Sequence, residues 1–176
     1  MKDILIRTDR FILKSLIKED VNERYLDWIN GPNRSEYIVN ENQERSIDDL
    51  CSYVEGKLLD EYVLFLGIFE LGNENHIGNI KYEPIDLQRG FAIMGILIGE
   101  EDWKGKGVAT EVIEASSKWL NKKYKTQKII LGVDRNNINA IKAYQKCGFN
   151  IEDTPYIESN SESGVTMVWD MTQEQI

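Results

Sequence analysis

The chain has 176 residues, of which 41% are hydrophobic, enough for one domain over 1–176 with a substantial core. Thirty acidic against 21 basic residues give a net charge of −9, which argues against a nucleic-acid partner and mildly favours a cationic one. Two cysteines and one histidine offer too few ligands for a zinc site, so no metal is expected. Because there is neither a membrane-length apolar run nor a signal-peptide core, we expect a cytoplasmic protein without a membrane partner.

The first part of the chain predicts strands followed by two helices. Apolar residues in mostly alternating positions predict a strand or a bent pair of strands over 4–16. A helix is expected to open at Lys18 and to end at the following Gly-Pro dipeptide. Residues 33–45 are polar and irregular, and Ser46 is expected to cap a second helix that runs to about Asp60.

Three strands are predicted next, over 62–71, 76–85 and 91–98, and they would form an antiparallel meander. The third is almost wholly apolar, as expected for a strand buried on both faces. His76 is expected to lie in a turn remote from the motifs and to have no special role.

After these strands, helical spacing of apolar residues predicts a helix over 108–124, and a strand follows over 127–133. The segment 134–136 is expected to cap another helix, which a Cys-Gly-Phe sequence closes. Two final strands are predicted over 149–152 and 164–170.

A basic, glycine-rich turn leads from strand 91–98 into helix 108–124; its sequence is Lys-Gly-Lys-Gly-Val-Ala, residues 104–109. Small residues let the backbone approach an anion, N–H groups converge on it, and the helix dipole adds to the attraction. The turn lacks the P-loop pattern and the third glycine of a dinucleotide fingerprint. It therefore predicts another kind of phosphate cradle, with a flexible turn at a helix start as the alternative.

This turn resembles motif A of the GCN5-related N-acetyltransferases (GNAT), Gln/Arg-x-x-Gly-x-Gly/Ala, with Lys104 in place of Gln or Arg. Lysine keeps the charge but loses the planar fork of arginine. Residues 137–149 resemble motif B of the same family, Asn-x-x-Ala-x-x-x-Tyr-x-Lys-x-Gly-Phe, in the family's order and separation. Segments 25–30, 77–80 and 103–107 resemble the branch with ribosomal-protein alanine, spermidine and some sugar-amine acetyltransferases.

The resemblance implies a mixed αβ fold (α+β) in which about four helices flank a mostly antiparallel sheet that splays open at its fourth strand, here 91–98. Acetyl-CoA would lie between strands four and five. The backbone of Ile96, Leu97 and Ile98 would pair with the pantetheine arm, and one N–H would polarise the thioester carbonyl. The pyrophosphate would lie on the turn formed by Lys104, Gly105, Lys106, Gly107, Val108, Ala109 and Thr110.

Two residues of motif B would take part in the chemistry. Asn137 and Tyr144 are seven residues apart, so they project from one helix face two turns apart. The resemblance gives Asn137 a hydrogen bond to the pantetheine, and gives Tyr144 the role of general acid toward the departing CoA thiolate. The alternatives are a first-turn polar residue and a core aromatic residue with a satisfied hydroxyl.

The general base is not identified. Relatives often carry a glutamate on strand four, and the matching residue is Ile93, which cannot transfer a proton. Glu83 or Asp86 near the end of strand three, or Glu36 or Glu41 in the polar loop, could deprotonate an amine directly or through water. Each is also compatible with a solvated surface carboxylate, and a chain of water molecules could replace the base.

The predicted reaction is direct attack of a primary amine on acetyl-CoA: a polyamine, an amino sugar or a protein N-terminus, with CoA as the product. Both a monomer and a homodimer are compatible with the sequence. Arg34 would suit a phosphate or carboxylate on the acceptor, whereas the acidic surface would suit a polyamine. A sensor that binds acetyl-CoA without turnover and a phosphate-binding interaction domain are the alternatives. The predicted acceptor-binding residues are Trp28, Arg34, Tyr37, Glu41 and Glu83.

Overall fold

The computed structural model describes residues 4–31, 44–157 and 163–172. Of the predicted site residues and base candidates, Arg34, Glu36, Tyr37 and Glu41 lie outside the described residues. No helix within the described ranges is long and apolar enough to cross a membrane. The elements in chain order are β1 (Leu5–Arg7), β2 (Phe11–Ser15), η1 (Lys18–Asp20), α1 (Glu23–Asn30), α2 (Ile47–Leu59), β3 (Leu64–Glu70), β4 (His76–Asp86), β5 (Phe91–Ile98), η2 (Glu101–Trp103), α3 (Val108–Tyr124), β6 (Lys128–Asp134), α4 (Ile138–Cys147), β7 (Asn150–Ile151) and β8 (Gly164–Asp170).

The strands form one eight-stranded sheet in the order β1-β2-β3-β4-β5-β6-β8-β7. The first five strands make the predicted antiparallel meander, and β8 pairs antiparallel with both β6 and β7. Among the described strands only β5 and β6 run parallel, and α3 provides the long crossover that a parallel pair requires. The predicted mixed αβ fold with a mostly antiparallel sheet is confirmed.

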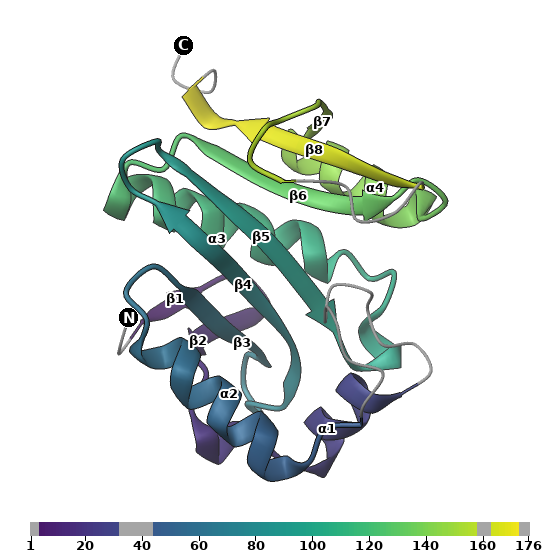
Figure 1. Ribbon diagram of the computed structural model, residues 1–176. Coiled ribbons are helices and arrows are strands. Elements are labelled where there is room, and N and C mark those ends of the chain that lie inside the picture. The colour runs from purple at the N-terminus through teal and green to yellow at the C-terminus, as the bar shows by residue number, and fades with distance from the viewer. Residues whose placement is uncertain (1–3, 32–43, 158–162, 173–176) are drawn as a thin grey trace.

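The parallel pair β5–β6 is short. Residues 91–93 pair with residues 128–130, and the register contains no later pair, although β5 continues beside β4 as far as Ile98. The two strands diverge from this short contact (Figure 1). The splay that the resemblance implied for strand 91–98 is therefore confirmed.

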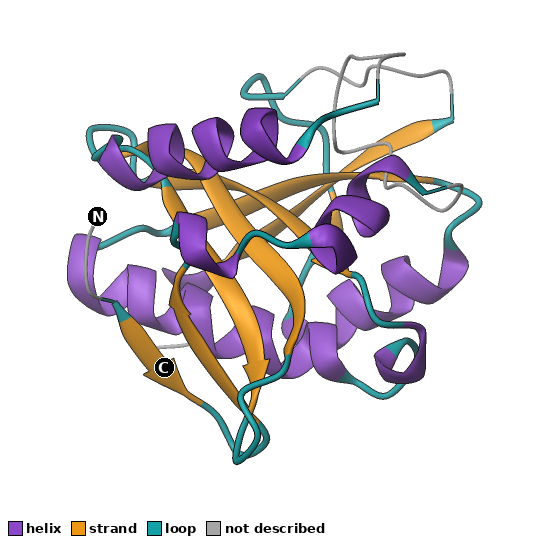
Figure 2. Ribbon diagram, turned by 90° about the horizontal axis from the view of Figure 1, so that it is seen from below, coloured by secondary structure: helices purple, strands orange, loops and turns teal. Residues whose placement is uncertain are grey.

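Helices cover both faces of the sheet (Figure 2). Strand residues alternate between these faces. The Tyr82 hydroxyl lies 2.8 Å from Ser116 Oγ of α3, whereas its neighbours Lys81 and Glu83 contact α2. The main core lies on the α3 face, and a second hydrophobic cluster joins α1 and α2 to the opposite face.

Helix starts follow the capping side chains. As predicted, Ser46 caps α2, with its Oγ accepting from the backbone N–H three residues on. Residues 18–20 form only a short 3-10 turn, and α1 begins after Asn22, which supplies the cap. Asn137, not the predicted segment 134–136, caps α4. In both places several capping residues of similar strength lie side by side, so local preference does not decide which of them caps the helix.

Two predictions are wrong: the place of His76 in the fold and the burial of β5. His76 does not lie in a turn but is the first residue of β4, and it is only 4% exposed. Its ring stacks on Phe69 with the ring centroids 4.8 Å apart. The strand β5 is not buried throughout, because residues 95–98 are half-buried where β6 has diverged.

Candidate active site

The second half of β5 has one neighbouring strand among the described residues. It pairs with β4, while β6 is no longer its partner after Ile93. At Gly95 a Cβ would meet no protein atom within 4 Å, so the space over this residue is open. Backbone N–H and C=O groups on this edge can therefore pair with a ligand that lies alongside as an added strand.

The glycine turn follows β5 through η2. Gly105 and Gly107 have left-handed backbone conformations, with φ values of +71° and +75°, which glycine adopts without steric cost. Gly107 is the N-cap of α3, a helix of 17 residues. A Cβ on Gly105 would have no protein atom within 4 Å, so protein packing leaves room for a side chain at this position. The turn is open to a ligand at a helix N-terminus, which suits an anion.

Arg10, between β1 and β2, braces this turn. Its Nη1 donates to Lys106 O (3.0 Å), and its Nε donates to Glu111 Oε2 (2.7 Å) in the first turn of α3. The Arg10 backbone N–H donates to the other carboxylate oxygen of Glu111 (2.9 Å). Burial opposes the charge on Glu111, but hydrogen bonds from Thr8 and Arg10 outweigh it and lower the pKa of that carboxyl. The N-terminal hairpin therefore helps to fix the turn.

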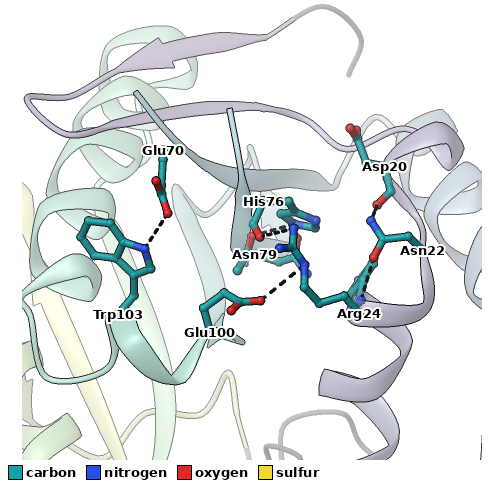
Figure 3. Close-up of polar contacts among 10 residues, drawn as sticks. Asp20, Asn22, Arg24, Glu70, His76, Asn79, Glu100 and Trp103 are labelled. Carbon is teal, nitrogen blue, oxygen red and sulfur yellow. Dashed lines mark hydrogen bonds and ion pairs between the residues drawn. The ribbon is translucent and has the colours of Figure 1, made fainter. Parts of the chain in front are cut away.

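Other polar contacts hold the segment that leads into the turn (Figure 3). Trp103 Nε1 donates to Glu70 Oε1 (2.8 Å). Glu100 Oε1 pairs with Arg24 Nε of α1 (3.4 Å), and Arg24 Nη2 donates to His76 O (3.1 Å). Together with the bond from Arg10 to Lys106, these contacts tie the segment between β5 and α3 to three parts of the chain: β3, α1 and the β1–β2 hairpin.

Trp28 lies beside the edge strand. Its ring packs on Gly99, where a Cβ would come within 2.0 Å of Trp28 Cδ2. Trp28 also lines a pocket of about 130 Å³ with Leu97 and Lys104, at the end of β5 and the start of the glycine turn. Its ring centroid is 5.0 Å from that of His76, in edge-to-face contact. Trp28 therefore borders the predicted path of acetyl-CoA.

His76 packs against Trp28, and its ring is in the neutral form. Its Nε2 lies 3.0 Å from Gly78 O and 2.8 Å from Asn79 Oδ1, contacts that suit an Nε2–H donor. Burial lowers the pKa of His76, which favours the neutral form. The sequence pattern did not identify this role because the aromatic rings around His76 come from α1 and β3, separate segments of the chain.

Of the two motif B residues, Asn137 caps α4 and Tyr144 lies within this helix. Asn137 uses its Oδ1 for the helix cap, which leaves the Nδ2 group to donate to a ligand. Tyr144 is 8% exposed, and its ring lies 5.9 Å from that of Phe149. Its hydroxyl makes no hydrogen bond within the described part of the chain. Burial, with a further contribution from Cys147, raises the pKa of Tyr144 to about 12.

The two candidates for the general base that the structure describes, Glu83 and Asp86, are engaged in other contacts. Glu83 bonds to Lys57 and Lys81, and these contacts outweigh burial and lower its carboxyl pKa, which weakens it as a base. Asp86 Oδ1 accepts from two backbone N–H groups in the β4–β5 turn (3.0 and 2.8 Å). No group of three or more His, Cys, Asp or Glu in the described ranges could hold a metal ion.

A family model described as an acetyltransferase (GNAT) domain matches residues 10–150, from the Arg10 brace through both motifs. The chain belongs to the GNAT acetyltransferase family. Two curated proteins match shorter segments. An N-alpha-acetyltransferase of Saccharolobus solfataricus is 34% identical over 71 residues, 40% of this chain and 41% of that protein. A spermine/spermidine N(1)-acetyltransferase of Bacillus subtilis is 38% identical over 50 residues, 28% of this chain and 33% of that protein.

These matched segments span less than half of each curated relative. Solved structures cover the GNAT chain more fully. A spermidine N-acetyltransferase from Vibrio cholerae, in complex with CoA and spermine, has a TM-score of 0.78 and 22% identity, over 92% of this chain and 96% of that one. A GNAT-family acetyltransferase from Bacillus anthracis has a TM-score of 0.77 and 16% identity, over 96% and 99%. At this identity the likeness establishes the shared fold.

The brace in this GNAT domain gives a first prediction. Replacing Arg10 by glutamine removes the ion pair to Glu111 and the bond to Lys106 O, so the turn loses its preferred shape. We expect the KM for acetyl-CoA to rise about three- to tenfold with kcat nearly unchanged, as measured by steady-state kinetics. The control is Arg89→Gln, which removes another exposed cation whose acidic partner, Asp86, is the last residue of β4. An equal effect of both variants would contradict a specific brace.

Proposed function

We propose that the protein is an N-acetyltransferase that moves an acetyl group from acetyl-CoA to a primary amine. The observation that carries this proposal is the edge of β5, which β6 leaves after Ile93 and which leads directly into the open glycine turn. Family membership supports the same reaction. A ligand with a strand-like arm and a pyrophosphate matches both features together.

The residues present fit acetyl-CoA. The backbone of Ile96, Leu97 and Ile98 would pair with the pantetheine arm, and Asn137 Nδ2 would donate to it. The turn from Lys104 to Thr110 would hold the pyrophosphate, with Gly105 leaving room for close approach. When bound, acetyl-CoA supplies an activated acetyl group as a thioester.

In the proposed reaction, the lone pair of the neutral amine attacks the thioester carbonyl carbon. A C–N bond forms, the C–S bond breaks, and the nitrogen releases a proton to water. A backbone N–H of β5 stabilises the negative charge that develops on the carbonyl oxygen. The Tyr144 hydroxyl donates its proton to the departing sulfur and is then reprotonated from solvent. No carboxylate base is needed if the amine arrives neutral.

The proposed acceptor is a small amine. Relatives described as spermine or spermidine acetyltransferases support this choice. A protein N-terminus as acceptor, a homodimer and the single domain over 1–176 stay predictions. Free-thiol release from acetyl-CoA tests the function, with a panel of polyamines, amino sugars, amino acids and peptides that begin with Ala or Ser. Turnover with one class supports the proposal, and thiol release no faster than without acceptor in every case contradicts it.

The burial of Tyr144 predicts the alkaline side of the pH profile. A general acid must be protonated, and a pKa raised to about 12 keeps this hydroxyl protonated well into the alkaline range. The amine must lose its proton, which happens as pH rises toward about 10 for ordinary primary amines. We therefore expect kcat/KM to increase up to about pH 10 without a falling limb. A falling limb with an apparent pKa near the ordinary tyrosine value of about 10 would contradict this environment.

A further inference from the structure

A cluster of basic side chains lies on the α2 face of the sheet. At its centre is Tyr53 of α2, with Arg45 Cζ, Lys57 Nζ and Lys81 Nζ at 5.1, 5.3 and 5.5 Å from its ring centre. Lys81 Nζ also donates to the Tyr53 hydroxyl (2.8 Å) and pairs with Glu83 Oε2 (2.8 Å). Lys57 Nζ bonds to the other oxygen of Glu83. We call these five residues the Tyr53 cluster.

The Tyr53 cluster contains three cations and one carboxylate, in a protein whose net charge is −9. The side chains of Lys57 and Lys81 are only 23% and 29% exposed. Burial acts against the charge on Lys81, but Tyr53 and Glu83 outweigh it and raise the pKa of its amine. Partly buried charges are costly unless they are matched. This excess of positive charge therefore favours a partner with negative charge.

Arg45 is held by hydrogen bonds to Asn30, and the carboxylate beside it, that of Asp49, is hydrogen-bonded to another residue. The Arg45 backbone N–H donates to Asn30 Oδ1 (3.0 Å), and Asn30 Nδ2 donates to Arg45 O (2.9 Å), which ties this residue to the end of α1. Asp49 interacts electrostatically with Arg45, but its Oδ2 already accepts from the backbone N–H and hydroxyl of Ser46 (3.0 and 2.6 Å). The backbone of Arg45 is therefore held in place, and its guanidinium, which lies over the Tyr53 ring, forms no ion pair with a carboxylate among the described residues.

The Tyr53 cluster borders the point where the acetyl group is expected. Lys81 lies directly opposite Gly95 in the β4–β5 register, and the space over Gly95 is open. On the proposed function, the pantetheine arm runs from the glycine turn along residues 96–98, so its thioester end arrives near Gly95. An amine that reaches this carbon from the α2 face has the rest of its molecule next to Lys81.

We infer that the Tyr53 cluster binds a negatively charged group, a carboxylate or a phosphate, on the amine acceptor. This inference rests on the proposed function and makes it more specific. Arg45, Lys57 and Lys81 would attract the anionic group while the amine points to the thioester. A polyamine carries only positive charge, so the same three side chains would repel it. The acceptor class is therefore an amine that also bears an acid group, despite the acidic surface of the protein as a whole.

Matched acceptor pairs test this inference. Thiol release from acetyl-CoA is measured with alanine against alaninamide, with glucosamine 6-phosphate against glucosamine, and with spermidine. We expect at least one acid-bearing member to exceed its neutral partner in kcat/KM by about tenfold or more, as expected for a charge-assisted hydrogen bond. The first pair reports on a carboxylate and the second on a phosphate. Spermidine is expected to be a poor acceptor.

Single substitutions test whether the preference for acid-bearing acceptors depends on the Tyr53 cluster. Lys81→Met keeps the aliphatic stem but removes the charge, and we expect the preference for the acid-bearing acceptor to fall about tenfold. Arg45→Gln, a surface change that leaves β4 intact, is expected to act in the same direction. The control is Lys118→Gln, which removes an exposed lysine of α3 that pairs with Glu114. Thermal unfolding and the KM for acetyl-CoA verify that each variant is folded and binds the donor.

Different results would overturn this inference and the proposed acetyltransferase function. Turnover that favours spermidine or the neutral member of both pairs would overturn the inference and leave the acetyltransferase function standing. A preference for acids that persists unchanged in Lys81→Met and Arg45→Gln would also overturn it. Failure of every amine to release thiol, with acetyl-CoA bound, would instead contradict the proposed function on which the inference rests.

Discussion

Replacement of Tyr144 by phenylalanine is expected to lower kcat about 100- to 10,000-fold, the usual contribution of a general acid. The ring of Tyr144 is 8% exposed and packs against Phe149, and phenylalanine preserves this packing. The hydroxyl makes no hydrogen bond to any described residue, so its removal is not expected to change thermal stability. The KM for acetyl-CoA is expected to stay nearly the same. Single-turnover kinetics with a saturating amine measure the chemical step directly.

The matched control is Tyr62→Phe, which removes the hydroxyl of a tyrosine that is 51% exposed and precedes β3. We expect this variant to retain full activity. A loss of less than about threefold in Tyr144→Phe would show that the sulfur takes its proton from another source. Equal losses in both variants would also rule out a specific role for Tyr144.

Replacement of Gly105 by valine is expected to raise the KM for acetyl-CoA about 10- to 100-fold. The φ of +71° strains a β-branched residue, and the added side chain occupies space that no protein atom fills. Both effects would keep a pyrophosphate from the backbone N–H groups of the turn, and each charge-assisted hydrogen bond lost accounts for about tenfold or more. Titration calorimetry with CoA measures this loss without an acceptor.

The chain provides a control with nearly the same backbone conformation. Gly90, in the turn between β4 and β5, has φ of +70°, and the nearest atoms to a Cβ there would be those of Gln127, at 3.6 Å or more. The variant Gly90→Val therefore carries a similar strain away from the proposed site. We expect it to lose stability comparable to that of Gly105→Val but to keep its affinity for CoA. Unchanged CoA binding in Gly105→Val would exclude the turn as a pyrophosphate site.

Much of the fold could be predicted from local patterns. The strand β5 has the predicted bounds, and Ser46 caps α2 as its side chain favours. The glycine turn and motif B carry most of their information in short segments, so sequence alone located the proposed donor site. The predictions failed where several capping residues compete, as at Asp20 and Asn22, and where burial depends on a distant strand, as along β5.

The acceptor side could not be predicted in the same way. Tyr53 and Lys57 are four residues apart on α2, a spacing that places them side by side, and Arg45 directly precedes the cap of the same helix. No spacing in the sequence indicates that Lys81 of β4 reaches the same tyrosine ring. The contact of His76 with Trp28 could not be predicted for the same reason, because the aromatic neighbours of His76 belong to α1 and β3. Such sites arise from long-range strand register, which periodicity does not encode.

The two alternatives differ from the enzyme in what the site must bind. A sensor would bind acetyl-CoA and release no thiol with any amine, so the thiol assay separates it from the transferase. A phosphate-binding interaction domain would use only the glycine turn and would leave the edge of β5 without a role. The half-buried residues 95–98 and the open space at Gly95 favour a ligand with an extended arm.

The central claim is that β5 and the glycine turn together bind the donor. Titration calorimetry with CoA and with adenosine 3′-phosphate 5′-diphosphate, at one ionic strength, tests it most directly because both ligands carry the 3′-phosphate and the pyrophosphate and only CoA carries pantetheine. We expect CoA to bind at least about tenfold more tightly than adenosine 3′-phosphate 5′-diphosphate, since several backbone hydrogen bonds along β5 add to its affinity. Equal affinities for the two ligands, or no binding of CoA, would contradict it.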